Sequence, residues 1–189
     1  MALKKINLPN LITICRIALI PFFLNFLVYG YTKYALITFV AAGLTDALDG
    51  AVARMTGTMS EVGATLDPLA DKMLALAAFI ALTAMGMIPL WLTLTVICRD
   101  VIIVSGSMVL YLQGHEFKVR PVLAGKAATF LQLTLLSVVM LGMYLDREFA
   151  ATPYLIWMTL LLTVVSGVQY VMRGLEIADR KAGGNFERS

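Results

Sequence analysis

Charged residues are scarce in this chain of 189 residues. They form 14% of the sequence, whereas 60% is hydrophobic, and the net charge is only +3. A soluble domain carries roughly 25% charged residues, and a chain with so few could not cover its surface with polar groups. The composition therefore excludes the water-soluble, collagen-like and disordered classes. We expect the partners to be membrane lipids, with no nucleic acid among them.

Cysteine and histidine are almost absent, with two and one residues respectively. Cys15 and Cys98 both lie within apolar runs and are far apart in the sequence. This placement favours reduced thiols in the core over a disulfide or a zinc site.

What the sequence does contain is six apolar runs, at residues 11–31, 34–55, 66–87, 89–113, 122–145 and 153–172. A helical membrane span needs about 20 mostly apolar residues. We therefore expect an all-α integral membrane protein with six transmembrane helices. Residues 1–10 are expected to form a juxtamembrane segment at the interface. Residues 1–173 then form one membrane domain, followed by a polar C-terminal tail at 174–189.

Twelve basic residues that lie outside the runs or near their ends predict the orientation. Ten of them fall on the side of the N-terminus, and only Lys33 and Arg147 fall on the other side. Because lysine and arginine accumulate in cytoplasmic loops, both termini are expected in the cytoplasm.

Acidic residues interrupt the second and third runs at helical spacing. In the second run, five residues at offsets 0, 3, 4, 7 and 8 share one helical face: Asp46, Asp49, Gly50, Ala53 and Arg54. The third run opens with another such face, at intervals of four: Gly63, Asp67 and Asp71. The second run ends and the third begins on the same side of the membrane. We therefore expect the two faces to meet at similar depth.

Four carboxylates at a membrane edge would repel one another unless cations lay between them. Ligands that are all oxygen favour Mg²⁺ or Mn²⁺ over zinc, and two such ions suit phosphoryl chemistry. Gly50 and Gly63 would allow a ligand to approach the backbone closely, and Arg54 would meet phosphate oxygens. The alternative is a solvated helix hairpin, which four acids on matched faces make the weaker interpretation.

These residues carry a resemblance. The pattern Asp46-x2-Asp49-Gly50-x2-Ala53-Arg54-x8-Gly63-x3-Asp67-x3-Asp71 resembles the signature of the CDP-alcohol phosphotransferase family. The resemblance implies a six-helix membrane enzyme, commonly a homodimer. Such an enzyme moves a phosphatidyl group from a CDP-linked lipid, CDP-diacylglycerol, to an alcohol and releases CMP.

The resemblance also implies roles for individual residues. Four aspartates would hold two ions of Mg²⁺ or Mn²⁺: Asp46, Asp49, Asp67 and Asp71. Asp71 would also be the catalytic base on the acceptor hydroxyl. The CDP moiety would be bound by Asp46, Gly50, Ala53, Arg54, Gly63 and Asp67.

The segment Pro9-Asn10-x2-Thr13-x2-Arg16 resembles the entry segment of the bacterial and mitochondrial branch that makes phosphatidylglycerol phosphate and cardiolipin. This implies a bacterial inner membrane or a mitochondrial inner membrane. The active site would then face the cytoplasm or the matrix.

The acceptor is a glycerol-type alcohol in that branch, and four basic residues are candidates to bind it: Arg99, Lys118, Arg120 and Lys126. Arg99 and Asp100 lie well inside the fourth run, and a structural ion pair there is as good an interpretation as an acceptor site. The Arg99-Asp100-Val101 segment resembles cardiolipin synthases. This slightly favours phosphatidylglycerol as acceptor over the alternative, glycerol 3-phosphate.

A different class also places aspartates within a membrane. A transporter uses them to relay protons or bind cations, but typically near the midplane and on broken helices. The acids here are expected toward one face of the membrane and beside an arginine. A cation or proton transporter is therefore a remote alternative.

Overall fold

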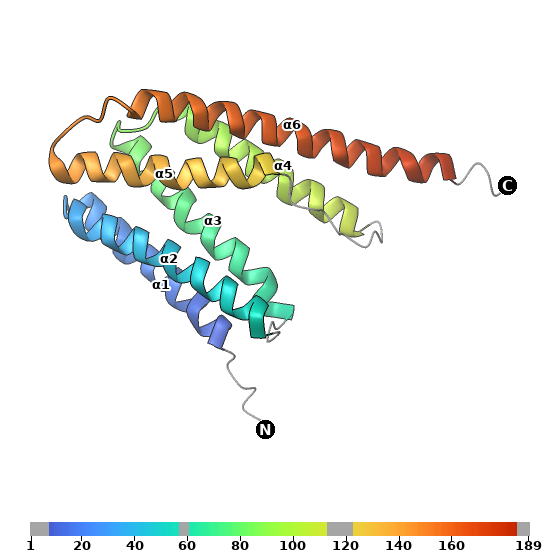
Figure 1. Ribbon diagram of the computed structural model, residues 1–189, viewed down its shortest axis with the longest axis horizontal. Helices are drawn as coiled ribbons and strands as arrows, with labels where there is room; N and C mark the ends of the chain where they lie inside the picture. The colour runs from blue at the N-terminus through green and yellow to red at the C-terminus, as the bar shows by residue number, and fades with distance from the viewer. Residues whose placement is uncertain (1–7, 57–60, 113–122, 185–189) are drawn as a thin grey trace, which may run out of the picture. The chain divides into compact units, whose positions relative to one another are not determined.

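The computed structural model describes the backbone at residues 8–56, 61–112 and 123–184, and the side chains at 17–45, 72–106 and 123–174. Over these residues the chain is all-helical, which confirms the expected class (Figure 1). Six helices are present in this part: α1 Leu8–Val28, α2 Thr32–Thr56, α3 Glu61–Ala84, α4 Leu90–Leu112, α5 Leu123–Leu145 and α6 Thr152–Gly184.

The odd-numbered helices end in the same way. Beyond α1, Gly30 has a φ of 77°, and Tyr31 donates its backbone N–H to the Phe26 carbonyl at 2.8 Å. Beyond α3, Gly86 has a φ of 73°, and Met87 bonds back to Leu82 at 2.9 Å. This is the Schellman arrangement, in which a residue of left-handed conformation lets the chain satisfy the last carbonyls and turn away. At the end of α5, Asp146 takes the same place with a φ of 49°.

The chain divides into two compact units. The first unit is Met1–Ile88 with Leu136–Phe149, and the second is Pro89–Leu135 with Ala150–Ser189. In the first unit α1 contacts both α2 and α3, and α2 contacts α3; in the second, α4 contacts α6 (Figure 1). The boundary falls within α5, whose earlier part belongs to the second unit and whose later part belongs to the first.

The described core of the first unit is built from apolar stripes on its helices. α2 buries Ala35, Phe39 and Ala42, and the Phe39 ring lies 5.8 Å from that of Phe23 on α1. The buried stripe of α3 includes Leu74, Ala78 and Leu82, at spacings of four residues. α2 and α3 contact each other less than they contact α1, so packing on α1 is what chiefly positions the two helices that carry the acids.

Two helices of the described part are long and apolar enough to cross a membrane, at Leu123–Leu145 and Thr152–Gly174, each with a mean hydropathy of 1.8. α6 continues beyond that span to Gly184. The polar stretch 174–184, expected from the sequence to lie in a tail, is therefore helical. Glu176 and Arg180 are spaced i, i+4, a pairing of opposite charges that favours a helix.

Cys98 differs from its expected place in the core. It is a free cysteine on the exposed surface of α4. The neighbouring residue, Arg99, occupies the inward position of that turn instead. Cys15 falls outside the side chains that the structure describes.

Candidate active site

The acids expected at the site lie on two consecutive helices of the first unit. The last third of α2 carries Asp46, Asp49, Gly50, Ala53 and Arg54, and the first half of α3 carries Gly63, Asp67 and Asp71. The structure describes the backbone of these eight residues and not their side chains. Their roles as ligands and base therefore stay predictions.

The helix bounds set the heights of the acids. Residues 57–60 join Thr56 to Glu61, so these two helix ends lie within about 19 Å of each other. Asp46 lies ten residues before Thr56 and Asp71 ten residues after Glu61, each about 15 Å along its helix. In Figure 1 the end of α2 and the start of α3 lie at the same end of the first unit. The two acids therefore have matched distances from the connection.

The buried face of α2 predicts where its acids fall. Ala35, Phe39 and Ala42 are buried at spacings of four and three residues. Continuing the same alternation of three and four leads to positions 46, 49 and 53. Asp46 and Asp49 therefore continue the register of the face that α2 packs inward.

The same holds for α3 in the opposite direction. Its buried residues Leu82, Ala78 and Leu74 are spaced by four, and a further step of three leads back to Asp71 and a step of four to Asp67. Both acidic faces thus extend inward faces whose packing the structure describes. This register fits an arrangement in which the two sets of acids meet.

The candidate ligands for a metal ion are the four aspartates of α2 and α3. Among the described side chains, no group of three or more His, Cys, Asp or Glu is placed to hold a metal ion. The four aspartates lie outside that set. Their chemistry, carboxylate oxygen alone, fits a hard divalent cation.

In the second unit, the predicted acceptor residue Arg99 lies at the centre of a cluster of contacts between α4 and α6. Its side chain is 7% exposed. Nη1 donates to Asp100 Oδ1 at 2.7 Å, and Nη2 donates to Ser166 Oγ at 2.9 Å. The guanidinium carbon lies 5.9 Å from the centre of the Tyr170 ring, within reach of a cation–π interaction. The buried Nε–H has no hydrogen-bond partner among the described residues.

Two glycines make room for this arginine. A Cβ at Gly125 of α5 would lie 3.3 Å from Arg99 Nη2, 3.3 Å from Tyr170 Cε2 and 3.4 Å from Ser166 Oγ. A Cβ at Gly167 of α6 would lie 3.6 Å from Arg99 Cγ, an ordinary contact. Three helices therefore converge on the guanidinium, and Gly125 is the position where a larger residue would displace it.

The cluster lies at different positions along α4 and α5. Residue 99 lies near the middle of its apolar run, but its guanidinium touches Gly125, which lies in the first turn of α5. That turn is one end of the candidate span Leu123–Leu145. The long side chain thus places its charge beside the start of α5.

The other predicted acceptor residues are less defined. Lys126 follows Gly125 on α5 and is exposed, so it does not share the buried face of its neighbour. Lys118 and Arg120 lie outside the described residues.

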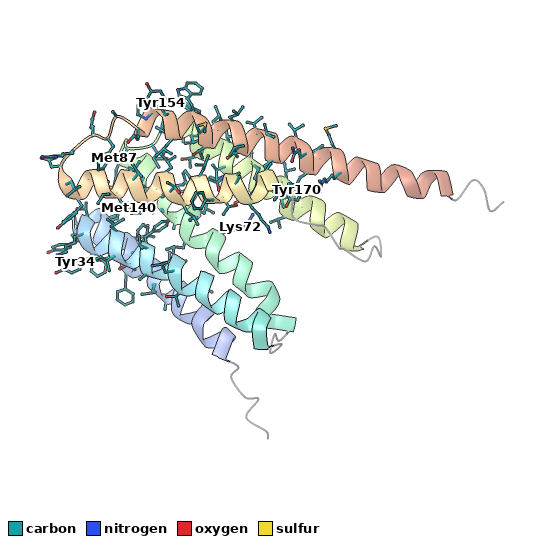
Figure 2. The ribbon with its side chains drawn as sticks, in the orientation of Figure 1. Tyr34, Lys72, Met87, Met140, Tyr154 and Tyr170 are labelled. Carbon is teal, nitrogen blue, oxygen red and sulfur yellow. The ribbon has the colours of Figure 1, made fainter. Side chains whose placement is uncertain are left out.

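Sequence reasoning missed Ser166 and Tyr170, the two α6 partners of Arg99. A signal for them existed: within the apolar sixth run, Thr159, Thr163, Ser166 and Tyr170 recur at spacings of four, three and four. The first three are fully buried. Figure 2 shows Tyr170 on α6 close to the first turns of α5. This stripe accepts one more hydrogen bond, in which Gln132 Nε2 donates to Thr163 Oγ1 at 3.1 Å.

The geometry can be compared with known proteins. The family model for CDP-alcohol phosphatidyltransferase matches residues 6–165, which is most of the chain. The chain belongs to the CDP-alcohol phosphatidyltransferase family. The enzyme class expected from the acidic pattern, a phosphatidyltransferase that depends on a CDP-linked lipid, is thereby confirmed. The family is membrane-associated, in agreement with the two long apolar helices.

Relatives of this phosphatidyltransferase carry two kinds of name. "Probable phosphatidylglycerophosphate synthase" of Mycobacterium tuberculosis is 35% identical over 176 residues, covering 89% of this chain and 82% of that protein. "CDP-diacylglycerol--glycerol-3-phosphate 3-phosphatidyltransferase" of Bacillus subtilis is 32% identical over 188 residues, covering 90% and 96%. "Cardiolipin synthase (CMP-forming)" of Streptomyces coelicolor is 34% identical over 134 residues, covering 67% and 61%.

Proposed function

We propose that this enzyme transfers a phosphatidyl group from CDP-diacylglycerol to a glycerol-type alcohol and releases CMP. The observation that carries the proposal is the register of α2 and α3. The acid-bearing positions continue the buried faces of both helices, at matched distances from a four-residue connection. Family membership supplies the reaction class.

Two divalent cations, Mg²⁺ or Mn²⁺, are proposed as cofactors held by Asp46, Asp49, Asp67 and Asp71. When bound, they would neutralise the charge of the phosphates during transfer. Along α2, Gly50 and Ala53 present little side chain, so the CDP moiety can approach the helix backbone there. Arg54, one position further, would pair with phosphate oxygens. On α3, Gly63 would allow the same close approach.

The transfer itself is a substitution at the phosphorus next to diacylglycerol. The acceptor hydroxyl oxygen forms a bond to this phosphorus as the bond to the CMP oxygen breaks. CMP leaves with that electron pair. Asp71 takes the hydroxyl proton as the new bond forms, which is the work of a positioned general base.

We further propose six spans with both termini in the cytoplasm of a bacterial cell, or in the matrix of a mitochondrion. The excess of basic residues on the side of the N-terminus supports this orientation. The site would then face the cytoplasm or the matrix, and CMP would be released there. A homodimer is proposed from the family resemblance.

The preferred acceptor is phosphatidylglycerol, as in cardiolipin synthesis. Arg99 is paired with Asp100 at 2.7 Å, so one of the four candidate cations is already compensated. Three candidate cations then remain. A headgroup with one negative charge needs fewer cations than the nearly dianionic glycerol 3-phosphate.

Glycerol 3-phosphate is the second candidate. The two relatives that match over 82% and 96% of their length are named for phosphatidylglycerophosphate synthesis or for glycerol 3-phosphate itself. The cardiolipin synthase of Streptomyces coelicolor matches over 61% of its length.

One experiment tests the proposal and separates the acceptors. Purified enzyme receives labelled CDP-diacylglycerol and Mg²⁺ or Mn²⁺, with phosphatidylglycerol, glycerol 3-phosphate, serine or inositol phosphate in parallel. We expect release of CMP and a labelled lipid with phosphatidylglycerol. Product with glycerol 3-phosphate alone would select the second candidate, and no CMP with any acceptor would refute the function.

A further inference from the structure

Arg99 is held in one orientation by residues from two other helices. Ser166 Oγ accepts from Nη2 at 2.9 Å, the Tyr170 ring lies beside the guanidinium, and the space at Gly125 admits it. All three contacts fall on the same end of the side chain. They determine where the guanidinium lies, which the flexible stem of an arginine would not do alone.

The contacts leave part of the binding capacity of Arg99 unused. Its guanidinium has five N–H donors in a planar fork. The buried Nε–H has no partner among the described residues, although an unsatisfied buried donor is costly. An arginine that serves only as a structural ion pair gains nothing from a buried donor without a partner. An arginine that binds an anionic ligand would use this donor in the bound state.

We propose that Ser166 and Tyr170 are positioning residues, which aim Arg99 at the phosphate of the phosphoglycerol acceptor. This inference rests on the proposed function and adds to it the residues that determine acceptor affinity. Asp100 compensates the charge while the acceptor is absent. The first turn of α5, whose Gly125 lies beside the guanidinium, also carries the exposed residues Leu123 and Lys126, and the phosphate would approach from there. A phosphate oxygen is an acceptor that the arginine fork matches well.

The main test compares Ser166→Ala and Tyr170→Leu in the full-length enzyme with Tyr170→Phe as the matched control. Phenylalanine keeps the ring face that meets the guanidinium, whereas leucine does not. We expect Ser166→Ala and Tyr170→Leu to raise the KM for the acceptor roughly 5- to 20-fold, about the worth of one hydrogen bond or one cation–π contact. The KM for CDP-diacylglycerol stays the same, and Tyr170→Phe behaves as the wild type.

Glycine variants give a second comparison. Gly125→Ala places a methyl group 3.3 Å from Nη2, whereas Gly106→Ala on α4 meets nothing within 4 Å. We expect the first variant to raise the acceptor KM and the second to leave it unchanged. Both insert the same methyl group into a helix, so a difference between them reports the position of Arg99.

A binding measurement keeps the inference separate from the reaction. Thermal stabilisation of the enzyme is measured without CDP-diacylglycerol, with glycerol 3-phosphate in one arm and phosphatidylglycerol micelles, against phosphatidylcholine micelles, in the other. Stabilisation of the wild type that is lost in Ser166→Ala supports the inference even if no transfer occurs. The arm that responds identifies the source of the phosphate.

Two results would overturn the inference while the proposed function stands. One is an unchanged acceptor KM in Ser166→Ala and Tyr170→Leu. The other is an equal rise in both KM values together with a lower melting temperature, which would make these residues structural only. If neither phosphate compound stabilises the wild type, the inference is also wrong.

Discussion

The two units of the molecule differ in what they bury. All the buried polar or charged side chains in the described part of the chain belong to the second unit: Thr93, Arg99, Gln132, Thr159, Thr163 and Ser166. The described core of the first unit is apolar, with Phe23, Leu27, Phe39 and Phe79 among its largest members. The described core of the first unit is thus apolar, whereas that of the second also buries polar side chains.

The two kinds of core fix the positions of their helices in different ways. In a membrane, apolar side chains pack through van der Waals contact alone, and shape decides the fit. A polar pair such as Gln132 with Thr163 satisfies its hydrogen bond in only one register. We interpret the first unit as the support whose helices carry the acids, and the second as the unit whose polar contacts fix the position of Arg99.

The largest effect is expected from the acids at the edge of the first unit. Asp67→Asn should lower turnover by about 10³-fold or more, because a carboxylate ligand of the proposed ions is lost. The variant should still fold in detergent, since the apolar core is untouched. CMP release is the measurement, with Asp146→Asn on the exposed turn after α5 as control. Full turnover in excess EDTA would show that the acids serve a structural role.

A second prediction separates the base from the ligands. Asp71→Asn should lower turnover by roughly 10² to 10⁴, the usual effect of a positioned base, while metal-dependent binding of CDP-diacylglycerol persists. Asp46→Asn should lose binding and turnover together. Affinity for the nucleotide lipid is measured for both variants. Equal loss of binding in the two would identify Asp71 as a ligand and require another base.

A smaller effect is expected from the basic segment between α4 and α5. Arg120→Ala should raise the acceptor KM by about tenfold, because one charged contact to the acceptor phosphate is lost. The acceptor KM of Ser166→Ala, in the second unit, is measured alongside for comparison. An acceptor KM unchanged by Arg120→Ala would limit that segment to a role in topology.

Much of this arrangement could be predicted from local periodicity. The six helices and the acidic faces follow from residues close in sequence, so their spacing was sufficient. The contact between Arg99 and Ser166 was not predictable in this way, because it joins residues 67 positions apart and depends on how α4 packs on α6. The role of Gly125 was hidden for the same reason. Periodicity also predicted too early an end for α6, which continues through the polar stretch to Gly184.

The smallest predicted effect concerns the hydrogen bond between Gln132 and Thr163, which tests whether polar contacts specify the second unit. Thr163→Val keeps the side-chain shape but leaves the buried amide of Gln132 without its acceptor. This should cost about 0.6 to 1.7 kcal/mol in the free energy of unfolding, measured by denaturation in detergent. Thr134→Val is the control, because the Thr134 hydroxyl donates only within α5, to the Phe130 carbonyl.

The double variant Gln132→Leu with Thr163→Val removes both polar partners and should recover most of the loss, since no buried donor is then left unsatisfied. If the double variant is as stable as the wild type but its acceptor KM rises, the polar contacts serve position more than stability. Such a result would sharpen the contrast with the first unit, where apolar exchange of similar volume, as in Phe39→Leu, should change stability by less than about 1.5 kcal/mol. Equal losses in Thr163→Val and Thr134→Val would contradict the distinction, because a bond within one helix would then matter as much as one between two.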